Sequence, residues 1–199
     1  MEKYLSIPGL LSNGRCRIIT EEVIPLLPDS PIVLEIGSFL GKSTVMWLDK
    51  LPNGATLDIN DSFEMTNKQI FDVVKTWIKG DHTELFDFLN KGGDHFGAWK
   101  MHTDSHPRSQ LIRNIFRMRT NDLLFDDKFN NHYDCVFLDA NHQNDDVTKQ
   151  LEYFKECNLI CGDDFETDNW PGVVSAVTKF VEENNRVLHH KRGVFWITK

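Results

Sequence analysis

The sequence contains no long hydrophobic run. Its longest apolar stretches, such as Pro31 to Ile36 and Cys135 to Leu138, are far shorter than the roughly 20 residues that a membrane-spanning helix needs. The first residues, Met1 to Tyr4, do not have the basic-then-apolar order of a secretion signal. We therefore expect a cytoplasmic protein with no membrane attachment.

Paired cysteines and a surplus of basic residues are also missing. The four cysteines, Cys16, Cys135, Cys157 and Cys161, form no Cys-x-x-Cys pair, and no second pair is spaced to complete a zinc site. We expect all four to be reduced thiols. The formal net charge of -8 argues against binding to a nucleic-acid backbone. The same acidity suits a site that holds cations.

The chain does contain apolar runs that alternate with helix-period segments, which is typical of a parallel sheet with crossover helices. With 199 residues, it is long enough for one core. We predict a single α/β domain over residues 1–199: a Rossmann-like doubly wound sheet, mostly parallel, with an antiparallel C-terminal strand and helices on both faces. The predicted strands are 31–36, 55–60, 115–119, 133–138, 158–161, 186–190 and 194–198, and the predicted helices are 41–51, 67–79, 145–155 and 171–183.

The histidine-rich segment 91–107 is the hardest to place. It contains His95, His102 and His106, and we interpret it as a polar loop or lid. Because His102 and His106 are four residues apart and could share a helix face, a zinc site is the alternative interpretation. Trp99 either lines an acceptor pocket or packs inside the protein.

A glycine-containing turn follows the first predicted strand, between Gly37 and Gly41. Open α/β sheets bind ligands at the carboxyl ends of their strands, and glycines allow the backbone to come close to a ligand. The dinucleotide pattern Gly-x-Gly-x-x-Gly fails because position 39 is Phe39. A Walker A loop fails because Ile36 stands where its first glycine should be. Both departures disfavour a nicotinamide or nucleotide ligand.

A third pattern, Glu-x-Gly-x-x-x-Gly-x-Ser, is complete in Glu35, Gly37, Gly41 and Ser43. This segment resembles the S-adenosylmethionine loop of class I methyltransferases. That cofactor carries a sulfonium and an α-amino group but no phosphate, so an acidic residue such as Glu35 suits it. We expect Gly37→Val to abolish cofactor binding by filling the space for the backbone approach.

An acidic residue about 20 positions further on is expected to hold the ribose hydroxyls. Asp61, at the exit of the second predicted strand, begins the triplet Asp61-Ser62-Phe63, which resembles the motif that follows this strand in several methyltransferases. The predicted cofactor-binding residues are Glu35, Gly37, Ser38, Gly41, Ser43, Asp61, Ser62, Asn121 and Asp122.

Acidic residues also follow the fourth and fifth predicted strands. Asp139 ends one strand, Asp163 and Asp164 end the next, and one crossover helix separates the two strands. Such strands are often adjacent, so the three carboxylates should meet at one sheet edge. They would repel one another unless a cation lies between them, and a hard divalent cation is the natural occupant. Alternatively, Asp139 caps the next helix and Asp164 faces solvent.

Several motifs in this half of the chain resemble one family. They are Phe-Leu-Asp at 137–139 with a histidine three residues on, Gly-Asp-Asp-Phe at 162–165, and Pro-Gly-Val from position 171. The chain resembles the macrocin-type sugar O-methyltransferases and cephalosporin-hydroxylase-like proteins, a metal-dependent group, and more distantly catechol O-methyltransferase. One departure is Glu156-Cys157-Asn158, which stands where Gly-Gly is usual before the fifth strand.

The resemblance implies roles for individual residues. Asp139, Asp163 and Asp164 would bind Mg²⁺ or another divalent cation, and His142 would be the general base, so that His142 and Asp139 are the catalytic residues. A metal at the acceptor oxygen orients it and lowers its pKa for an in-line methyl transfer. A neutral imidazole with an ordinary histidine pKa could then take the proton.

The sequence therefore predicts an S-adenosylmethionine-dependent methyltransferase that methylates a hydroxyl of a small molecule or sugar. We expect a small-molecule acceptor as the partner, with no nucleic acid and no membrane, and homo-oligomerisation is left open. Two alternatives also stay open: a nucleotide- or nicotinamide-binding enzyme on the same fold, and a non-catalytic Rossmann-like binding protein.

Overall fold

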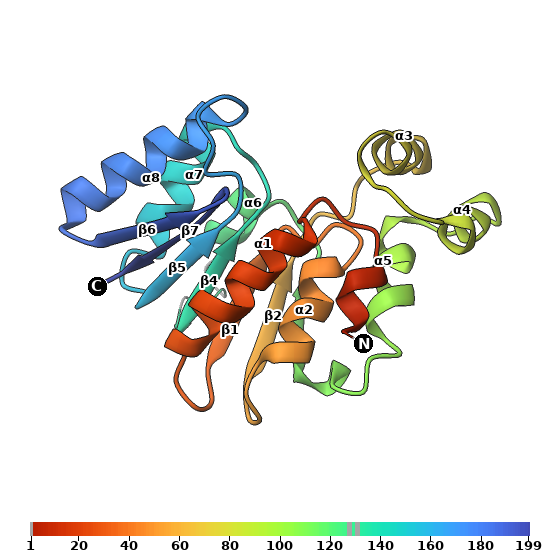
Figure 1. Ribbon diagram of the computed structural model, residues 1–199, viewed down its shortest axis with the longest axis horizontal. Helices are drawn as coiled ribbons and strands as arrows, with labels where there is room; N and C mark the ends of the chain where they lie inside the picture. The colour runs from red at the N-terminus through yellow and green to blue at the C-terminus, as the bar shows by residue number, and fades with distance from the viewer. Residues whose placement is uncertain (1, 127–128, 130–131) are drawn as a thin grey trace.

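The protein is built around one seven-stranded sheet with helices on both of its faces (Figure 1). The computed structural model describes residues 2–126, 129 and 132–199. The strand order is β3-β2-β1-β4-β5-β7-β6. Strands β1 to β5 pair in parallel, whereas β7 is antiparallel to both of its neighbours. The predicted fold class, including the antiparallel C-terminal strand, is confirmed.

The elements agree closely with the periodicity of the sequence. The strands are β1 (Ile32–Ile36), β2 (Thr56–Asn60), β3 (Ile112–Phe116), β4 (Cys135–Leu138), β5 (Leu159–Gly162), β6 (Val187–Lys191) and β7 (Val194–Thr198). The helices are α1 (Asn13–Ile18), α2 (Lys42–Lys50), α3 (Asn67–Trp77), α4 (Thr83–Asn90), α5 (His95–Thr103), α6 (Thr120–Leu124), α7 (Asn144–Tyr153) and α8 (Pro171–Asn184). Every predicted strand and helix is present, although β3 begins three residues before its predicted start at 115.

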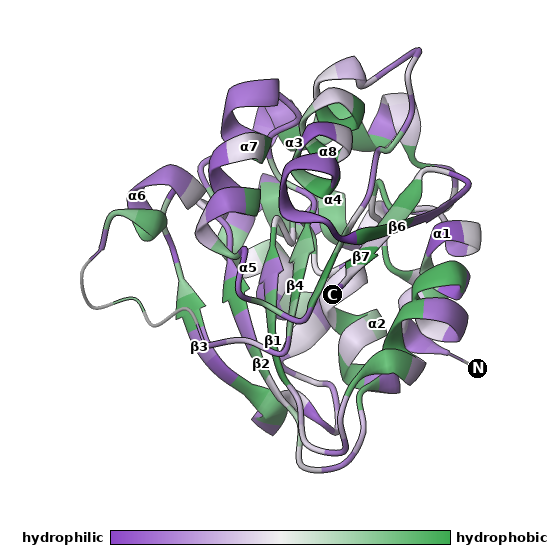
Figure 2. Ribbon diagram, turned by 90° about the vertical axis from the view of Figure 1, so that its left-hand side faces the viewer, coloured by the Kyte–Doolittle hydropathy of each residue, from purple (hydrophilic) through white to green (hydrophobic). Residues whose placement is uncertain are grey.

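The hydrophobic core lies on both faces of the sheet, because successive strand residues point to opposite sides. Val33 and Phe137 belong to the core cluster shared with Trp47 of α2. Leu34 and Val136 belong to the cluster that includes residues of α7 and α8. Figure 2 shows the hydrophobic residues concentrated on the sheet and on the inward sides of the helices. Burial of both faces leaves the carboxyl ends of the parallel strands as the place for polar chemistry.

Three helices, α3 to α5, lie between β2 and β3, and they correct one prediction. Residues 91–107 do not form a polar loop or lid, because most of the segment is helix α5. Asp94 caps this helix by accepting a hydrogen bond from the backbone N–H of Gly97 (2.7 Å). Trp99 is only 1% exposed and Ala98 is fully buried. The segment looks polar in sequence because it contains three histidines. In the structure these histidines bond to backbone carbonyls and to an aspartate, which lets them pack inside the protein.

Two further expectations concern membranes and cysteines. Among the described helices, none has the length and apolar character needed to cross a bilayer. All four cysteines are buried free thiols, as predicted. Cys135 and Cys161 lie on neighbouring strands with their sulfur atoms 3.7 Å apart.

Candidate cofactor and carboxylate site

The glycine turn connects β1 to α2 at the carboxyl edge of the sheet. Gly37 has φ +86°, and a Cβ atom there would lie 2.1 Å from the carbonyl oxygen of Asp139. Gly41 has φ +90°, and its Cβ would lie 3.2 Å from Cδ1 of Trp99. The close approach that requires Gly37 is therefore made by the protein's own chain after β4. A valine side chain at position 37 would clash with that chain segment whether or not a ligand is bound. Gly37→Val is therefore expected to disturb the fold of the turn, and not only to fill the space for a cofactor as the sequence suggested.

Asp61 lies next to this turn and holds it. Its Oδ2 accepts hydrogen bonds from the backbone N–H groups of Ser38 (3.0 Å) and Phe39 (2.9 Å), and its Oδ1 accepts one from Phe63 (2.8 Å). Phe39 has φ +46°, a left-handed conformation that is strained for a bulky residue. Asp61, which was predicted to bind the ribose, is thus in direct contact with the predicted cofactor loop, although Asp61 follows β2 and the loop follows β1.

Glu35 lies beneath the turn rather than on its surface. Its side chain is fully buried, and its Oε2 accepts a hydrogen bond from the Thr44 hydroxyl (2.6 Å). The Thr44 hydroxyl in turn accepts one from the indole N–H of Trp99 (3.2 Å). Burial raises the pKa of Glu35 to about 8, although the hydroxyls of Ser43 and Thr44 oppose that rise. Among the described residues, Oε1 has no hydrogen-bond partner.

The remaining predicted cofactor residues fall into two groups. Ser38, Ser43 and Ser62 lie in or beside the turn, and the buried Ser38 hydroxyl has no hydrogen-bond partner in the part of the chain that the structure describes. Asn121 and Asp122 lie on α6, after β3. Asn121 donates a hydrogen bond to Asp146 of α7 (2.8 Å), and Asp122 is exposed. The first group lies at or near the turn after β1, whereas the second follows β3, which is two strands away from β1 in the sheet.

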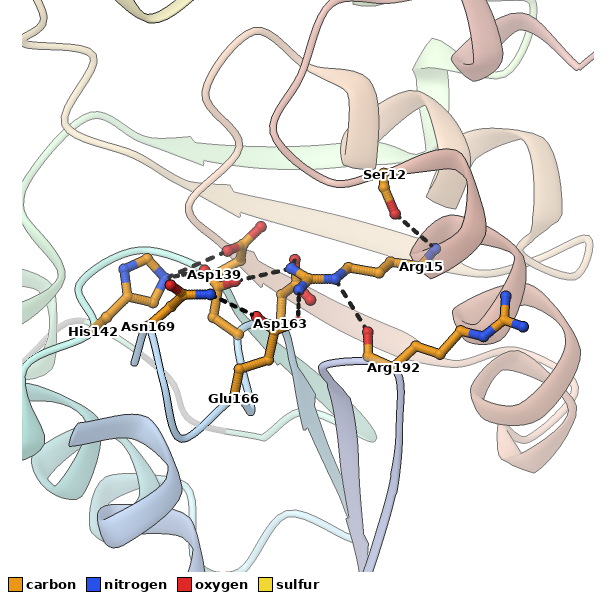
Figure 3. A network of polar contacts seen from close by, with 9 residues as sticks. Ser12, Arg15, Asp139, His142, Asp163, Glu166, Asn169 and Arg192 are labelled. Carbon is orange, nitrogen blue, oxygen red and sulfur yellow. Dashed lines mark hydrogen bonds and ion pairs between the residues drawn. The ribbon is translucent and has the colours of Figure 1, made fainter. Parts of the chain in front are cut away.

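The predicted acidic cluster forms where β4 and β5 end side by side, with Leu138 paired to Gly162 (Figure 3). The Nε2 atom of His142 lies 2.9 Å from Oδ2 of Asp164 and 3.8 Å from Oδ1 of Asp139. One ligand atom from each of these three residues lies within 4.8 Å of the others. The structure therefore brings His142 together with two of the three predicted acids, Asp139 and Asp164, whereas Asp163 is not part of this group among the described residues.

Arg15 of α1 is part of this cluster, and the sequence reasoning missed it. Its Nη1 lies 2.8 Å from Oδ2 of Asp163 and 2.9 Å from Oδ1 of Asp164. Its Nη2 donates to Glu166, and its Nε donates to the carbonyl of Arg192 (3.2 Å; Figure 3). Nothing in the local sequence distinguishes this arginine from a solvated one, since its partners lie about 150 positions away. The chain itself thus supplies a cation to its acidic cluster.

The charges around the cluster shift the acidity of each group. Burial raises the pKa of Asp163 to about 8 and of Asp139 to about 6. Burial would also raise the pKa of Asp164, but bonds to His142 and Arg15 outweigh it and lower that pKa. For His142 burial favours a lower pKa, yet Asp139 and Asp164 outweigh it and raise the pKa to about 9. This value is higher than the ordinary histidine pKa expected from the sequence.

The residues present fit a divalent cation. Arg15 donates hydrogen bonds to one carboxylate oxygen of Asp163 and to one of Asp164. The second oxygen of each carboxylate is not bonded to Arg15. Oδ1 of Asp163 is a buried atom that forms no hydrogen bond to any described residue, and Nε2 of His142 faces the carboxylate oxygens of Asp164 and Asp139. Carboxylate oxygens with at most one imidazole are a donor set that Mg²⁺ or Mn²⁺ accepts.

A cavity of about 360 Å³ lies next to the cluster, lined by the loop after β5, by Val174 of α8 and by His190 near the end of β6. Its lining includes Phe165, Glu166, Asp168 and Asn169. Trp170, next in the chain and 38% exposed, places its ring 4.3 Å from that of His142. The described residues that line the cavity include neither His142 nor Trp170, although Trp170 follows Asn169 directly. Trp99, by contrast, is buried and packs inside the protein.

Similarity to known proteins lies in structure and not in sequence. No family model matches the chain, and no curated protein matches it in sequence. TomG from Streptomyces achromogenes, an O-methyltransferase of tomaymycin synthesis solved with S-adenosylmethionine, is 15% identical, with 96% of this chain and 81% of TomG covered at a TM-score of 0.58. An O-methyltransferase from Bacillus cereus in complex with S-adenosylhomocysteine is also 15% identical, covering 97% of this chain and 84% of that one at 0.58.

A third similar structure has a sugar acceptor in its name. CalS11, a TDP-rhamnose 3'-O-methyltransferase of calicheamicin biosynthesis, is 11% identical, with 94% of this chain and 81% of CalS11 covered at a TM-score of 0.56. At these identities the likeness concerns the fold. The chain therefore has the Rossmann-like fold of S-adenosylmethionine-dependent O-methyltransferases.

Proposed function

We propose that this protein is an S-adenosylmethionine-dependent methyltransferase that methylates a hydroxyl group of a small molecule. The observation that carries the proposal is the glycine turn held by Asp61, set beside the acidic cluster at the edge of a methyltransferase fold. A sugar is the acceptor we favour. The cavity in the loop after β5 combines the ring of Phe165 with carboxylate and amide groups, and CalS11 is a TDP-rhamnose methyltransferase.

In this proposal the cofactor lies over the turn. Asp61 has a carboxylate at the exit of β2 to share with the ribose hydroxyls, and Glu35 offers its free Oε1 beneath the turn. The acceptor oxygen attacks the methyl carbon in line with the sulfur, the carbon–sulfur bond breaks, and the hydroxyl proton leaves to a base. Trp170 and the loop after β5 hold the acceptor in that line.

For the acidic cluster we propose that Asp139, Asp163 and Asp164 hold Mg²⁺ or another divalent cation. Bound there, the cation would lower the pKa of the acceptor hydroxyl. His142 is the proposed base, since its ring lies between the cluster and Trp170. Its pKa of about 9 keeps the ring protonated at neutral pH, so it would act as a base only at higher pH or where a cation bound at the carboxylates lowers that pKa. Asp139 and Asp164 orient that ring. His142→Ala should lower turnover by about a hundredfold with little change in cofactor affinity, as expected for the loss of a general base.

Calorimetry with S-adenosylhomocysteine, NAD and ATP tests the cofactor assignment, and only the first should bind. Methyl transfer to a panel of sugars and small alcohols, with and without EDTA, then tests the reaction and the metal. Binding of NAD or ATP in place of S-adenosylhomocysteine would overturn the proposal. Tight binding without transfer to any acceptor would favour a non-catalytic binding protein.

A further inference from the structure

Helix α5 packs directly against the glycine turn, and two of its histidines reach the turn's backbone. His102 Nδ1 lies 2.7 Å from the carbonyl oxygen of Leu40, and His95 Nε2 lies 3.2 Å from that of Phe39. A carbonyl oxygen only accepts hydrogen bonds, so both ring nitrogens must carry a hydrogen. His102 therefore donates from Nδ1 and His95 donates from Nε2, which assigns a different ring position to each histidine.

Together with the bonds to Asp61, these hydrogen bonds hold both the N–H and the C=O groups of a strained segment. On one side of the turn, Asp61 accepts from the N–H groups of Ser38 and Phe39. On the other side, the two histidines donate to the carbonyls of Phe39 and Leu40. A left-handed conformation such as that of Phe39 persists only where its surroundings hold it. Burial lowers the pKa of both histidines, which suits neutral rings that donate from one nitrogen.

We propose that His95 and His102 are positioning residues for the cofactor, which hold the Phe39 and Leu40 carbonyls and so keep the glycine turn in its binding shape. This proposal rests on the proposed function. Neither histidine needs to touch the cofactor. The third histidine of the segment acts elsewhere, since His106 Nε2 pairs with Asp49 (3.0 Å) and its Nδ1 accepts from the N–H of Arg108 (3.1 Å).

The different donor positions allow a sharp test. An asparagine amide nitrogen overlies Nδ1 of histidine, and a glutamine amide nitrogen overlies Nε2. His102→Asn and His95→Gln therefore keep the donor, whereas His102→Gln and His95→Asn move it. We expect calorimetry to give S-adenosylhomocysteine affinities within about threefold of wild type for the matched pair. The mismatched pair and both alanine variants should lose about tenfold each, the effect of one hydrogen bond.

His106→Ala is the control, because it removes a buried bond outside the turn. It should lower the melting temperature without changing S-adenosylhomocysteine affinity. In turnover assays, the mismatched variants should raise KM for S-adenosylmethionine and leave kcat nearly unchanged.

Equal affinities for matched and mismatched variants would overturn the positioning role while the proposed function stands. Failure of the wild type to bind S-adenosylhomocysteine would overturn both. If the alanine variants do not fold, the comparison of His102→Asn with His102→Gln decides the question by itself.

Discussion

At the scale of single residues, the site depends on charged groups that are buried with few partners. Glu35 has one hydroxyl donor on Oε2, and Asp163 has Arg15 on one oxygen. Both carboxyl groups are almost inaccessible to water, and both have a raised pKa. A buried carboxylate with too few donors is costly, so each of these residues makes stability depend on its surroundings.

Glu35 should make the unfolding free energy depend on pH. The folded-state pKa of about 8 lies above the ordinary glutamate value of 4.5, so the unfolded chain releases its proton first as pH rises. Stability is then lost between pH 4.5 and pH 8, by about 1.4 kcal/mol for each pKa unit of difference. Glu35→Gln keeps an acceptor for Thr44 and should remove this decline.

Urea unfolding at pH 5 and pH 9 measures the effect. Glu35→Gln should gain stability relative to wild type at pH 9 but much less at pH 5. The control is Glu182→Gln on the exposed side of α8, which should follow the wild type. If the unfolding free energies of Glu35→Gln and wild type changed with pH in parallel, Glu35 would not be a carboxyl group with a raised pKa in the folded protein.

Arg15 should be required for the stability of the acidic cluster. Arg15→Met leaves Asp163 buried without its cation, and breaking one side of such a pair costs about 3 kcal/mol. Mg²⁺ should restore part of that loss if the cluster binds the cation as proposed. Arg17→Met, an exposed position two residues along the chain, is the matched control. Equal melting temperatures for the two variants would show that the pairing contributes nothing.

At the scale of elements, short-range patterns predicted most of the fold. The segments that form β1, β4 and β5 are short, continuous apolar runs, and the acids at their ends were predicted to converge because parallel strands end at one edge. Helix α5 escaped prediction because its hydrophobic period is weak, and its buried face includes His95 and Thr103. Arg15 escaped because its partners are non-local. Pairings across 148 positions leave no periodic signal in the sequence.

Helix α5 should couple its own stability to cofactor binding. Asp94→Ala removes its N-terminal cap and should cost about 1 kcal/mol of unfolding free energy. Because α5 contacts the turn, S-adenosylhomocysteine affinity should also fall severalfold. Thr66→Ala removes the capping box of α3, which forms no hydrogen bond to the turn in the described residues. It should cost similar stability with a smaller change in affinity, as measured by calorimetry and thermal melting.

At the scale of the whole molecule, the negative net charge of the chain corresponds to a local cluster of acidic side chains. The formal net charge is -8, and four acidic side chains, Asp139, Asp163, Asp164 and Glu166, gather with Arg15 and His142 at one sheet edge. A cationic sulfonium and a divalent cation would both be attracted there. The charge of the whole chain therefore agrees with the chemistry of its site, although the fold itself is determined by the two apolar faces of the sheet.

The contacts of Arg15 with residues far along the chain have a consequence for biosynthesis. Its partners lie at Asp163, Asp164, Glu166 and Arg192. Such long-range contacts close late because a large loop must be ordered first. During translation Arg15 has to wait for all of its partners until Arg192 has emerged. A nascent chain can thus pair β1 to β4 while the acidic cluster is still open, and the turn between β6 and β7, which contains Arg192, completes it.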